Sequence, residues 1–164
     1  MVAKNFDYIP LVQPFFILRE CRPRNGFRSL EFTVAPMVGA ADGVNEKGLC
    51  ITLDYAFATD AGSPAPLITM VIAEALAKCA SVNEAAAFIV RQPRWGAGML
   101  MLADASGDLA SVELTNTRSA IRRPAHRAGA AGPLHDGCRG RSLSAFLAAE
   151  LGGRLSLLVD ALLR

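Results

Sequence analysis

The 164-residue sequence predicts an α+β domain, in which strands are grouped with strands and helices with helices. Three observations favour this class. Extended segments rich in Val, Ile, Phe and Leu fill residues 2–55, two adjoining helical patterns follow, and extended segments return after Pro93. We therefore expect residues 1–124 to form one core, followed in the same domain by a loop at 125–140 and a helical segment at 141–164.

The first third of the chain predicts a sheet. Residues 13–20 and 27–35 flank the turn sequence Arg-Pro-Arg-Asn-Gly, which favours a hairpin. Asp42-Gly43 and Gly48 bracket a tight turn, and a strand follows at residues 49–55, where Cys-Ile-Thr-Leu suits a half-buried sheet surface. After the helices, further strands are expected at residues 98–103, 109–115 and 117–122.

Two adjoining helices separate these groups of strands. Ser63-Pro64 predicts the start of the first, whose apolar residues recur at helical spacing up to Lys78. The sequence Ser-Val-Asn-Glu at residues 81–84 has the pattern of a capping box, in which serine and glutamate each accept a hydrogen bond from an amide at the helix start. Short helical patterns at 142–151 and 155–163 close the chain.

Charge and cysteine spacing exclude several classes of function. The net charge is only +2 and the basic residues are scattered, so we expect no nucleic-acid or anionic-membrane surface. The most apolar stretch, residues 66–80, is interrupted by Glu74 and Lys78 and is too short to cross a bilayer. The four cysteines show no metal-ligand spacing, so no zinc site, disulfide framework or redox cofactor is implied, and a cytoplasmic location is the simplest expectation.

Three stretches are more specific than the rest: residues 2–8 (Val-Ala-Lys-Asn-Phe-Asp-Tyr), residues 42–49 (Asp-Gly-Val-Asn-Glu-Lys-Gly-Leu), and residues 101–108 followed by Ser111-Val112-Glu113. In this order they resemble the cysteine branch of the N-terminal-nucleophile (Ntn) hydrolases. That branch includes choloylglycine hydrolases, penicillin V acylases and the peptidase C45-like acyl-coenzyme A:6-aminopenicillanate acyltransferases. The resemblance covers residues 2–124 and implies part of an αββα sandwich of antiparallel sheets with a helix pair, truncated at both ends.

The resemblance also implies roles for four residues. The Arg-Asn-x-Asp pattern of the branch corresponds to residues 4–7, so Lys4 is expected to stabilise a cysteine thiolate and Asp7 to hold the α-amine that acts as its base. Choloylglycine hydrolases place an oxyanion-binding asparagine where this chain has Asp54 and Tyr55. An ionised Asp54 cannot donate a hydrogen bond, which leaves a backbone amide, a protonated Asp54 or Tyr55 for that role.

Residues 42–49 are expected to be structural. Gly43 and Gly48 permit unusual backbone angles, and the sequence Asn-Glu-Lys at residues 45–47 would cap the turn in water. The plain alternative for Lys4 and Asp7 is that they are ordinary charges at a strand edge.

The nucleophile itself is missing from the pattern. The branch places it well upstream of Lys4, where this chain has only Met1, Val2 and Ala3. Cys21, Cys50 and Cys79 have the surroundings of packing residues, and Cys138 with His135 would form a poor dyad on a loop. A second oxyanion asparagine is expected near residues 134–137, which read Leu-His-Asp-Gly.

Three interpretations follow. The first is a linear-amide hydrolase or acyltransferase that acts on a small-molecule acyl amide, in which this chain lacks the catalytic cysteine and is inactive alone. The second is a non-catalytic remnant of the same fold, and the third is an unrelated α+β binding or self-association module. A partial fold exposes apolar faces and strand edges, so we also expect a homo-oligomer.

Overall fold

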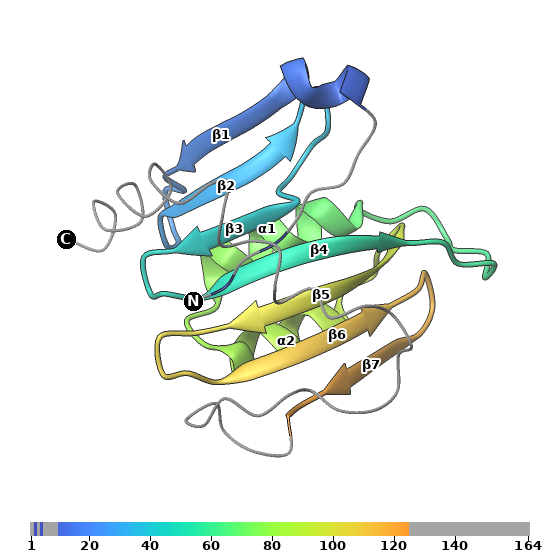
Figure 1. Ribbon diagram of the computed structural model, residues 1–164. Coiled ribbons are helices and arrows are strands. Elements are labelled where there is room, and N and C mark those ends of the chain that lie inside the picture. The colour runs from blue at the N-terminus through green and yellow to red at the C-terminus, as the bar shows by residue number, and fades with distance from the viewer. Residues whose placement is uncertain (1, 3, 5–9, 125–164) are drawn as a thin grey trace.

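The computed structural model describes residues 2, 4 and 10–124, which form one antiparallel sheet with two α-helices on one of its faces. The sheet has seven strands whose spatial order follows the chain order, so each strand pairs with the next and β1 and β7 lie at the edges (Figure 1). A short 3-10 helix, Pro10–Phe15, precedes the sheet. The strands are β1 (Phe16–Cys21), β2 (Ser29–Val34), β3 (Asp42–Asn45), β4 (Cys50–Ala56), β5 (Ala97–Ala103), β6 (Leu109–Leu114) and β7 (Ser119–Arg122).

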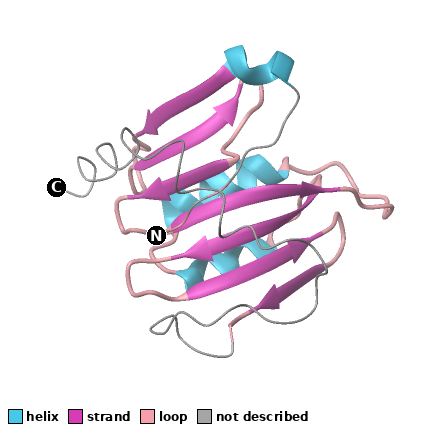
Figure 2. Cartoon of the chain, viewed as in Figure 1, coloured by secondary structure: helices cyan, strands magenta, loops and turns pink. Residues whose placement is uncertain are grey.

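Helices α1 (Ile68–Lys78) and α2 (Val82–Arg91) connect β4 to β5 and lie on the same face of the sheet (Figure 2). Helix α1 contacts β2, β3 and β4, whereas α2 contacts β5, β6 and β7. Side chains alternate along a strand, so Ile51 and Leu53 of β4 face the helices while Thr52 and Asp54 face away from them. We call the side of the sheet that bears Asp42, Thr52 and Asp54 the far face.

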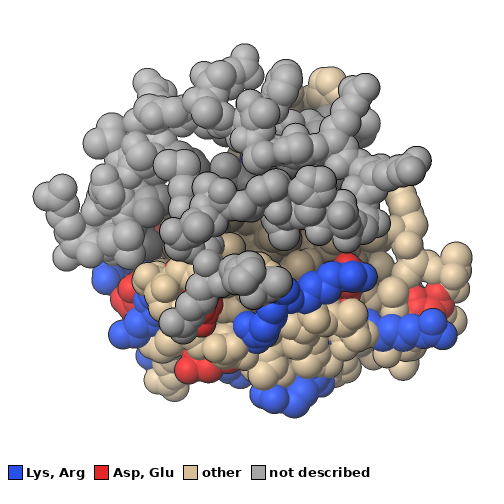
Figure 3. Space-filling model, turned by 60° about the horizontal axis from the view of Figure 1, so that its bottom comes forward, with Lys and Arg blue, Asp and Glu red and all other residues tan. Residues whose placement is uncertain are grey.

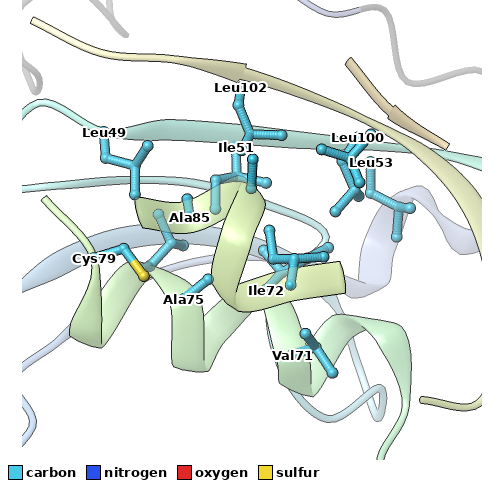
Figure 4. Close-up of a cluster of buried hydrophobic side chains, with 14 of the residues drawn as sticks. Leu49, Ile51, Leu53, Val71, Ile72, Ala75, Cys79, Ala85, Leu100 and Leu102 are labelled. Atoms are coloured by element: carbon cyan, nitrogen blue, oxygen red, sulfur yellow. The ribbon is translucent and has the colours of Figure 1, made fainter. Parts of the chain in front are cut away.

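The hydrophobic core lies between the sheet and the helix pair (Figure 4). Burial of one Leu, Ile or Val side chain contributes about 1.5–3 kcal/mol, so this layer stabilises two helices that would be too short to persist alone. The largest fully buried apolar side chains are Leu49, Ile51, Leu53, Val71, Ile72, Leu76, Val82, Ile89, Leu100, Leu102 and Val112.

The predicted α+β fold class is confirmed, and so are most of the predicted strands. Strand β1 pairs with β2 as the expected hairpin, and β5, β6 and β7 pair in succession. The structure differs at residues 42–45, which were predicted to open a turn. They form β3, which pairs with both β2 and β4, and the turn is confined to Glu46 and Lys47.

Helix α1 begins at Ile68, so the start predicted at Ser63-Pro64 is wrong. The backbone N–H of Trp95 donates to the carbonyl oxygen of Pro66 at 2.7 Å, and the N–H of Ile68 donates to that of Trp95 at 2.9 Å. These two hydrogen bonds hold residues 66–68 extended beside Trp95. A tertiary pairing therefore overrides the local signal for a helix start.

The predicted start of α2 is confirmed, but the amide that Glu84 binds lies one residue earlier than a capping box places it. Ser81 is the N-cap, and its Oγ accepts a hydrogen bond from the backbone N–H of Glu84 at 3.3 Å. The Glu84 carboxylate accepts from the N–H of Ala80 at 2.8 Å, one residue before the N-cap that a capping box would use. The bond to Ser81 satisfies an amide that the first turn of a helix leaves without a backbone partner, and the bond to Glu84 satisfies the amide that precedes the N-cap.

Basic and acidic side chains are interspersed on the face that Figure 3 shows. Arg28 pairs with Glu46 and Arg122 pairs with Glu113, both at exposed positions, where water and salt screen an ion pair so that it adds little to stability. Among the described residues, no helix is long and apolar enough to cross a membrane. The segments predicted at 125–140 and 141–164, with Cys138 and His135, lie outside the described residues.

Candidate active site

Lys4 lies on the far face, where β3 begins beside β4. Its Nζ donates a hydrogen bond to Asp42 Oδ1 at 2.9 Å and another to the backbone oxygen of Leu53. The Oδ1 atom of Asp54 is 3.9 Å from the same nitrogen. Only 12% of the Lys4 side chain is exposed, so the ammonium is largely withdrawn from water between two carboxylates. A cation in this place can stabilise a neighbouring anion on the far face.

The four residues predicted for the site are brought together only in part. Lys4 and Asp54 meet on the far face. Tyr55 follows Asp54 on β4, so its side chain leaves the strand on the opposite side, and its hydroxyl donates to Met37 Sδ at 3.1 Å. Asp7 lies outside the described residues, and its role stays a prediction.

The described cysteines have the environments of packing residues. Burial, and next the charge of Asp42, raises the pKa of Cys50 to about 11. Burial, and next the charge of Glu84, raises the pKa of Cys79 to about 11. Burial also raises the pKa of Cys21. A thiol with a raised pKa stays protonated at neutral pH, whereas a nucleophilic cysteine needs a lowered one.

Residues 42–45 serve both faces of the sheet. Asn45 was predicted to lie in water but is fully buried, and its Nδ2 donates to the carbonyl oxygens of Leu76 at 2.7 Å and Cys79 at 2.8 Å. Gly43 faces the same helix, where a Cβ atom would lie 2.5 Å from Leu76 Cδ1. Asn45 does cap the turn, because its Oδ1 accepts from the N–H groups of Lys47 and Leu49. The expectation that it lies in water is wrong, because the turn sequence does not reveal that α1 ends against it.

Asp42 is the residue of this site that the sequence analysis missed. Its partner Lys4 lies 38 positions away along the chain, and the two belong to different motifs. Only the pairing of β3 with β4 brings them together. Strand alternation over residues 42–45 would have been the signal, because it places Asp42 on the face opposite Gly43 and Asn45. The part of the chain that the structure describes contains no cluster of three or more side chains suited to hold a metal ion.

Comparisons with known proteins agree with this architecture. The family model described as acyl-coenzyme A:6-aminopenicillanic acid acyl-transferase matches residues 1–130. The Caenorhabditis elegans ortholog of N-acylethanolamine-hydrolyzing acid amidase superposes with a TM-score of 0.60 at 13% identity, over 73% of this chain and 57% of that one. This likeness shows that the chain shares the Ntn-hydrolase fold.

Two further solved structures are similar to part of the chain. Penicillin V acylase from Agrobacterium tumefaciens is 27% identical over 59% of this chain and 33% of its own, with a TM-score of 0.48. A variant of conjugated bile acid hydrolase from Clostridium perfringens is 19% identical over 67% of this chain and 42% of its own, with a TM-score of 0.45. The chain thus spans between about a third and three fifths of the length of these three structures. No curated protein matches it in sequence.

Proposed function

Because the chain belongs to the acyl-coenzyme A:6-aminopenicillanic acid acyl-transferase family, we propose that it forms part of an enzyme that cleaves or transfers the acyl group of a linear amide. Family membership also overturns the interpretation of the chain as an unrelated α+β module. The substrate proposed is a small acyl amide, of the kind that the similar Caenorhabditis elegans acid amidase is named for. We place the reaction on the far face, beside Lys4.

The observation that carries this proposal is the position of the Lys4 ammonium. It is held between Asp42 at 2.9 Å and Asp54 at 3.9 Å and is largely removed from water. A surface lysine would instead point its charge into solvent, because hydration of the ammonium favours exposure. A buried cation beside a reacting thiol stabilises the thiolate over the thiol, which is the role proposed for Lys4.

The reaction proposed has two steps. A cysteine thiolate attacks the amide carbonyl carbon, the C–N bond breaks, and the amine leaves with a proton, so that a thioester remains. Water then attacks the thioester to release the acid, or an acceptor amine attacks it to form a new amide, and the thiolate is regenerated. We propose that the cysteine lies upstream of Lys4, because the thiols of Cys50 and Cys79 are held protonated by burial.

Asp54 and Tyr55 would have different tasks in this scheme. The Asp54 carboxylate faces the Lys4 cation, which suits an acceptor that orients the ammonium and does not suit an oxyanion donor. We therefore propose that a backbone amide donates to the oxyanion. The Tyr55 side chain leaves β4 on the face opposite Asp54, where its hydroxyl donates to Met37 Sδ, so it would act away from the reacting carbonyl.

The experiment that tests the proposal is turnover of acyl amides by the protein expressed with the upstream sequence that carries the proposed cysteine, and by the Lys4→Met variant of that protein. Penicillin V, an N-acylethanolamine and a conjugated bile acid would be incubated with each protein, and the released amine measured by mass spectrometry. Loss of one charged group that stabilises the reacting anion typically lowers kcat by about 100-fold or more, and we expect this of Lys4→Met. Lys47→Met is the matched control, because Lys47 is exposed and lies over the ring of Phe27. Equal rates for Lys4→Met and wild type would remove Lys4 from the mechanism.

The second interpretation is a non-catalytic remnant, and it is favoured because burial keeps the thiols of Cys50 and Cys79 protonated. It predicts that the chain hydrolyses none of these amides. It also predicts that the reading frame upstream of Met1 encodes no cysteine. The two functions are separated by sequencing that frame and by determining the N-terminus of the mature protein by mass spectrometry, because the enzyme requires a cysteine before Lys4.

A further inference from the structure

Asp42 and Leu53 form a closed arrangement of hydrogen bonds with Lys4. Asp42 Oδ1 accepts from the backbone N–H of Leu53 at 3.0 Å and from Lys4 Nζ at 2.9 Å. The same Lys4 nitrogen donates to the carbonyl oxygen of Leu53. Leu53 lies one residue beyond the last β3–β4 pair, Asp42 with Thr52. The ammonium is therefore tied to a fixed point of the sheet, although it ends a flexible four-carbon side chain.

Of the two carboxylates beside Lys4, Asp42 is the better placed to fix its position. It is closer, at 2.9 Å against 3.9 Å for Asp54, and its side chain is 18% exposed against 52%. Its acceptor oxygen is itself held by the Leu53 amide. Asp54 is exposed enough for water to compete for its carboxylate, which weakens an ion pair.

The structural tasks of the β3 sequence are performed by its other residues. Gly43 allows the close approach of Leu76, and Asn45 binds the carbonyl groups at the end of α1. Both act on the helix side of the sheet. Asp42 acts on the far face, where its side chain binds Lys4 and the Leu53 amide.

We propose that Asp42 is a positioning residue of the active site, which holds the Lys4 ammonium at the start of β3 beside Asp54. This inference rests on the proposed function, because it assigns Asp42 the task of presenting Lys4 to the reacting thiol. Without Asp42, the Lys4 ammonium would lose its closest carboxylate and would be held less firmly at this place. The amide-cleaving step would then be slower, because its cation would be displaced more often, while the fold persisted.

The first test measures the accessibility of Lys4 and requires no enzymatic activity. The full chain, Asp42→Ala and Asp42→Asn would be acylated briefly with an N-hydroxysuccinimide ester, and modification of Lys4 and Lys47 compared by mass spectrometry. Hydrogen bonds to a charged group are strong enough that we expect Lys4 of Asp42→Ala to react about tenfold faster or more. Asp42→Asn keeps an acceptor for the Leu53 amide but loses the negative charge, so an intermediate increase is expected. Lys47 should react equally in all three proteins.

The control variant is Glu46→Gln, which removes a carboxylate four positions from Asp42 that pairs with Arg28. It should leave Lys4 at the wild-type reaction rate, whatever its effect on stability. An unchanged rate at Lys4 in both Asp42 variants would overturn the inference. A rise at Lys4 and Lys47 together would overturn it too, because it would indicate general loosening of the fold.

The second test applies to any preparation that turns over an acyl amide. Asp42→Asn is expected to lower kcat with little change in KM, because it displaces a group that acts on the reacting atoms and not on the acyl chain. A wild-type kcat in this variant would contradict the inference. If no preparation turns over any amide, the proposed function fails, and the acylation test still decides whether Asp42 positions Lys4.

Discussion

Asn45 provides the sharpest test of how this fold is held together. Its side chain is fully buried and makes four hydrogen bonds. Nδ2 donates to the carbonyl oxygens of Leu76 and Cys79, and Oδ1 accepts from the backbone N–H groups of Lys47 and Leu49 at 3.0 and 3.1 Å. One amide thus joins the end of α1 to the turn between β3 and β4.

The cost of Asn45→Ala follows from these bonds. Each buried hydrogen bond contributes about 1 kcal/mol net, and buried groups left without a partner lose their hydration as well. The Lys47 amide lies on an exposed turn residue and can bind water, whereas Leu49 is fully buried. We therefore expect the free energy of unfolding to fall by about 3–4 kcal/mol. This loss should come from the missing hydrogen bonds at the end of α1 and in the turn, because no large apolar side chain is removed from the core.

Urea unfolding followed by circular dichroism measures this change, with Asn45→Asp and Glu46→Gln as companions. Asn45→Asp keeps both acceptor bonds but faces two carbonyl oxygens with a carboxyl group, whose anion is disfavoured by burial. Its folded-state pKa should be raised, so stability is retained at low pH and lost as pH rises. Glu46→Gln removes an exposed ion pair that water screens, so it should lower the free energy of unfolding far less than Asn45→Ala does. A loss below about 1.5 kcal/mol for Asn45→Ala would refute this account of the α1 attachment.

Two further predictions test single positions. Gly39 and Gly107 have nearly equal φ angles of +85° and +86°, but a Cβ at Gly39 would lie 2.3 Å from the backbone of Thr69 whereas nothing lies within 4 Å of one at Gly107. Gly107→Ala should cost about 1–2 kcal/mol from strain alone, and Gly39→Ala at least about 2 kcal/mol more in urea unfolding; equal losses would contradict the clash. Hydrogen bonds from Thr117 and then Thr115 lower the pKa of Asp60 to about 2 from 3.8, so its contribution to stability is present above about pH 4 and lost as pH falls towards 2. Asp60→Asn should make the fall of the melting temperature across this range less steep, and an unchanged slope would contradict the assignment.

Much of the fold could be predicted from the sequence because it depends on local patterns. Apolar extended segments bounded by turn sequences located β4, β5 and β6, and the Ser81 signal located the start of α2. The start of α1 could not be predicted in this way. The hydrogen bonds that hold residues 66–68 beside Trp95 join segments far apart in the chain and leave no local pattern.

The candidate site shows the same division. Lys4 and Asp54 could be selected from the sequence because they lie in motifs that resemble a known family, and the structure brings them within 3.9 Å of each other. The place of Asp42 beside Lys4 could not be predicted. It depends on where β3 begins relative to β4, which is fixed by the register Asp42 with Thr52.

The sequence by itself determined the α+β class, the family and the identity of the basic residue on the far face. These properties depend on residue type and spacing along the chain, which folding does not change. Only the tertiary structure decided that Asn45 is buried against α1 and that Asp42 holds Lys4. Both contacts cross more than thirty positions of sequence, from Asn45 to Leu76 and from Lys4 to Asp42, so their partners become neighbours only when the sheet and the helices have packed.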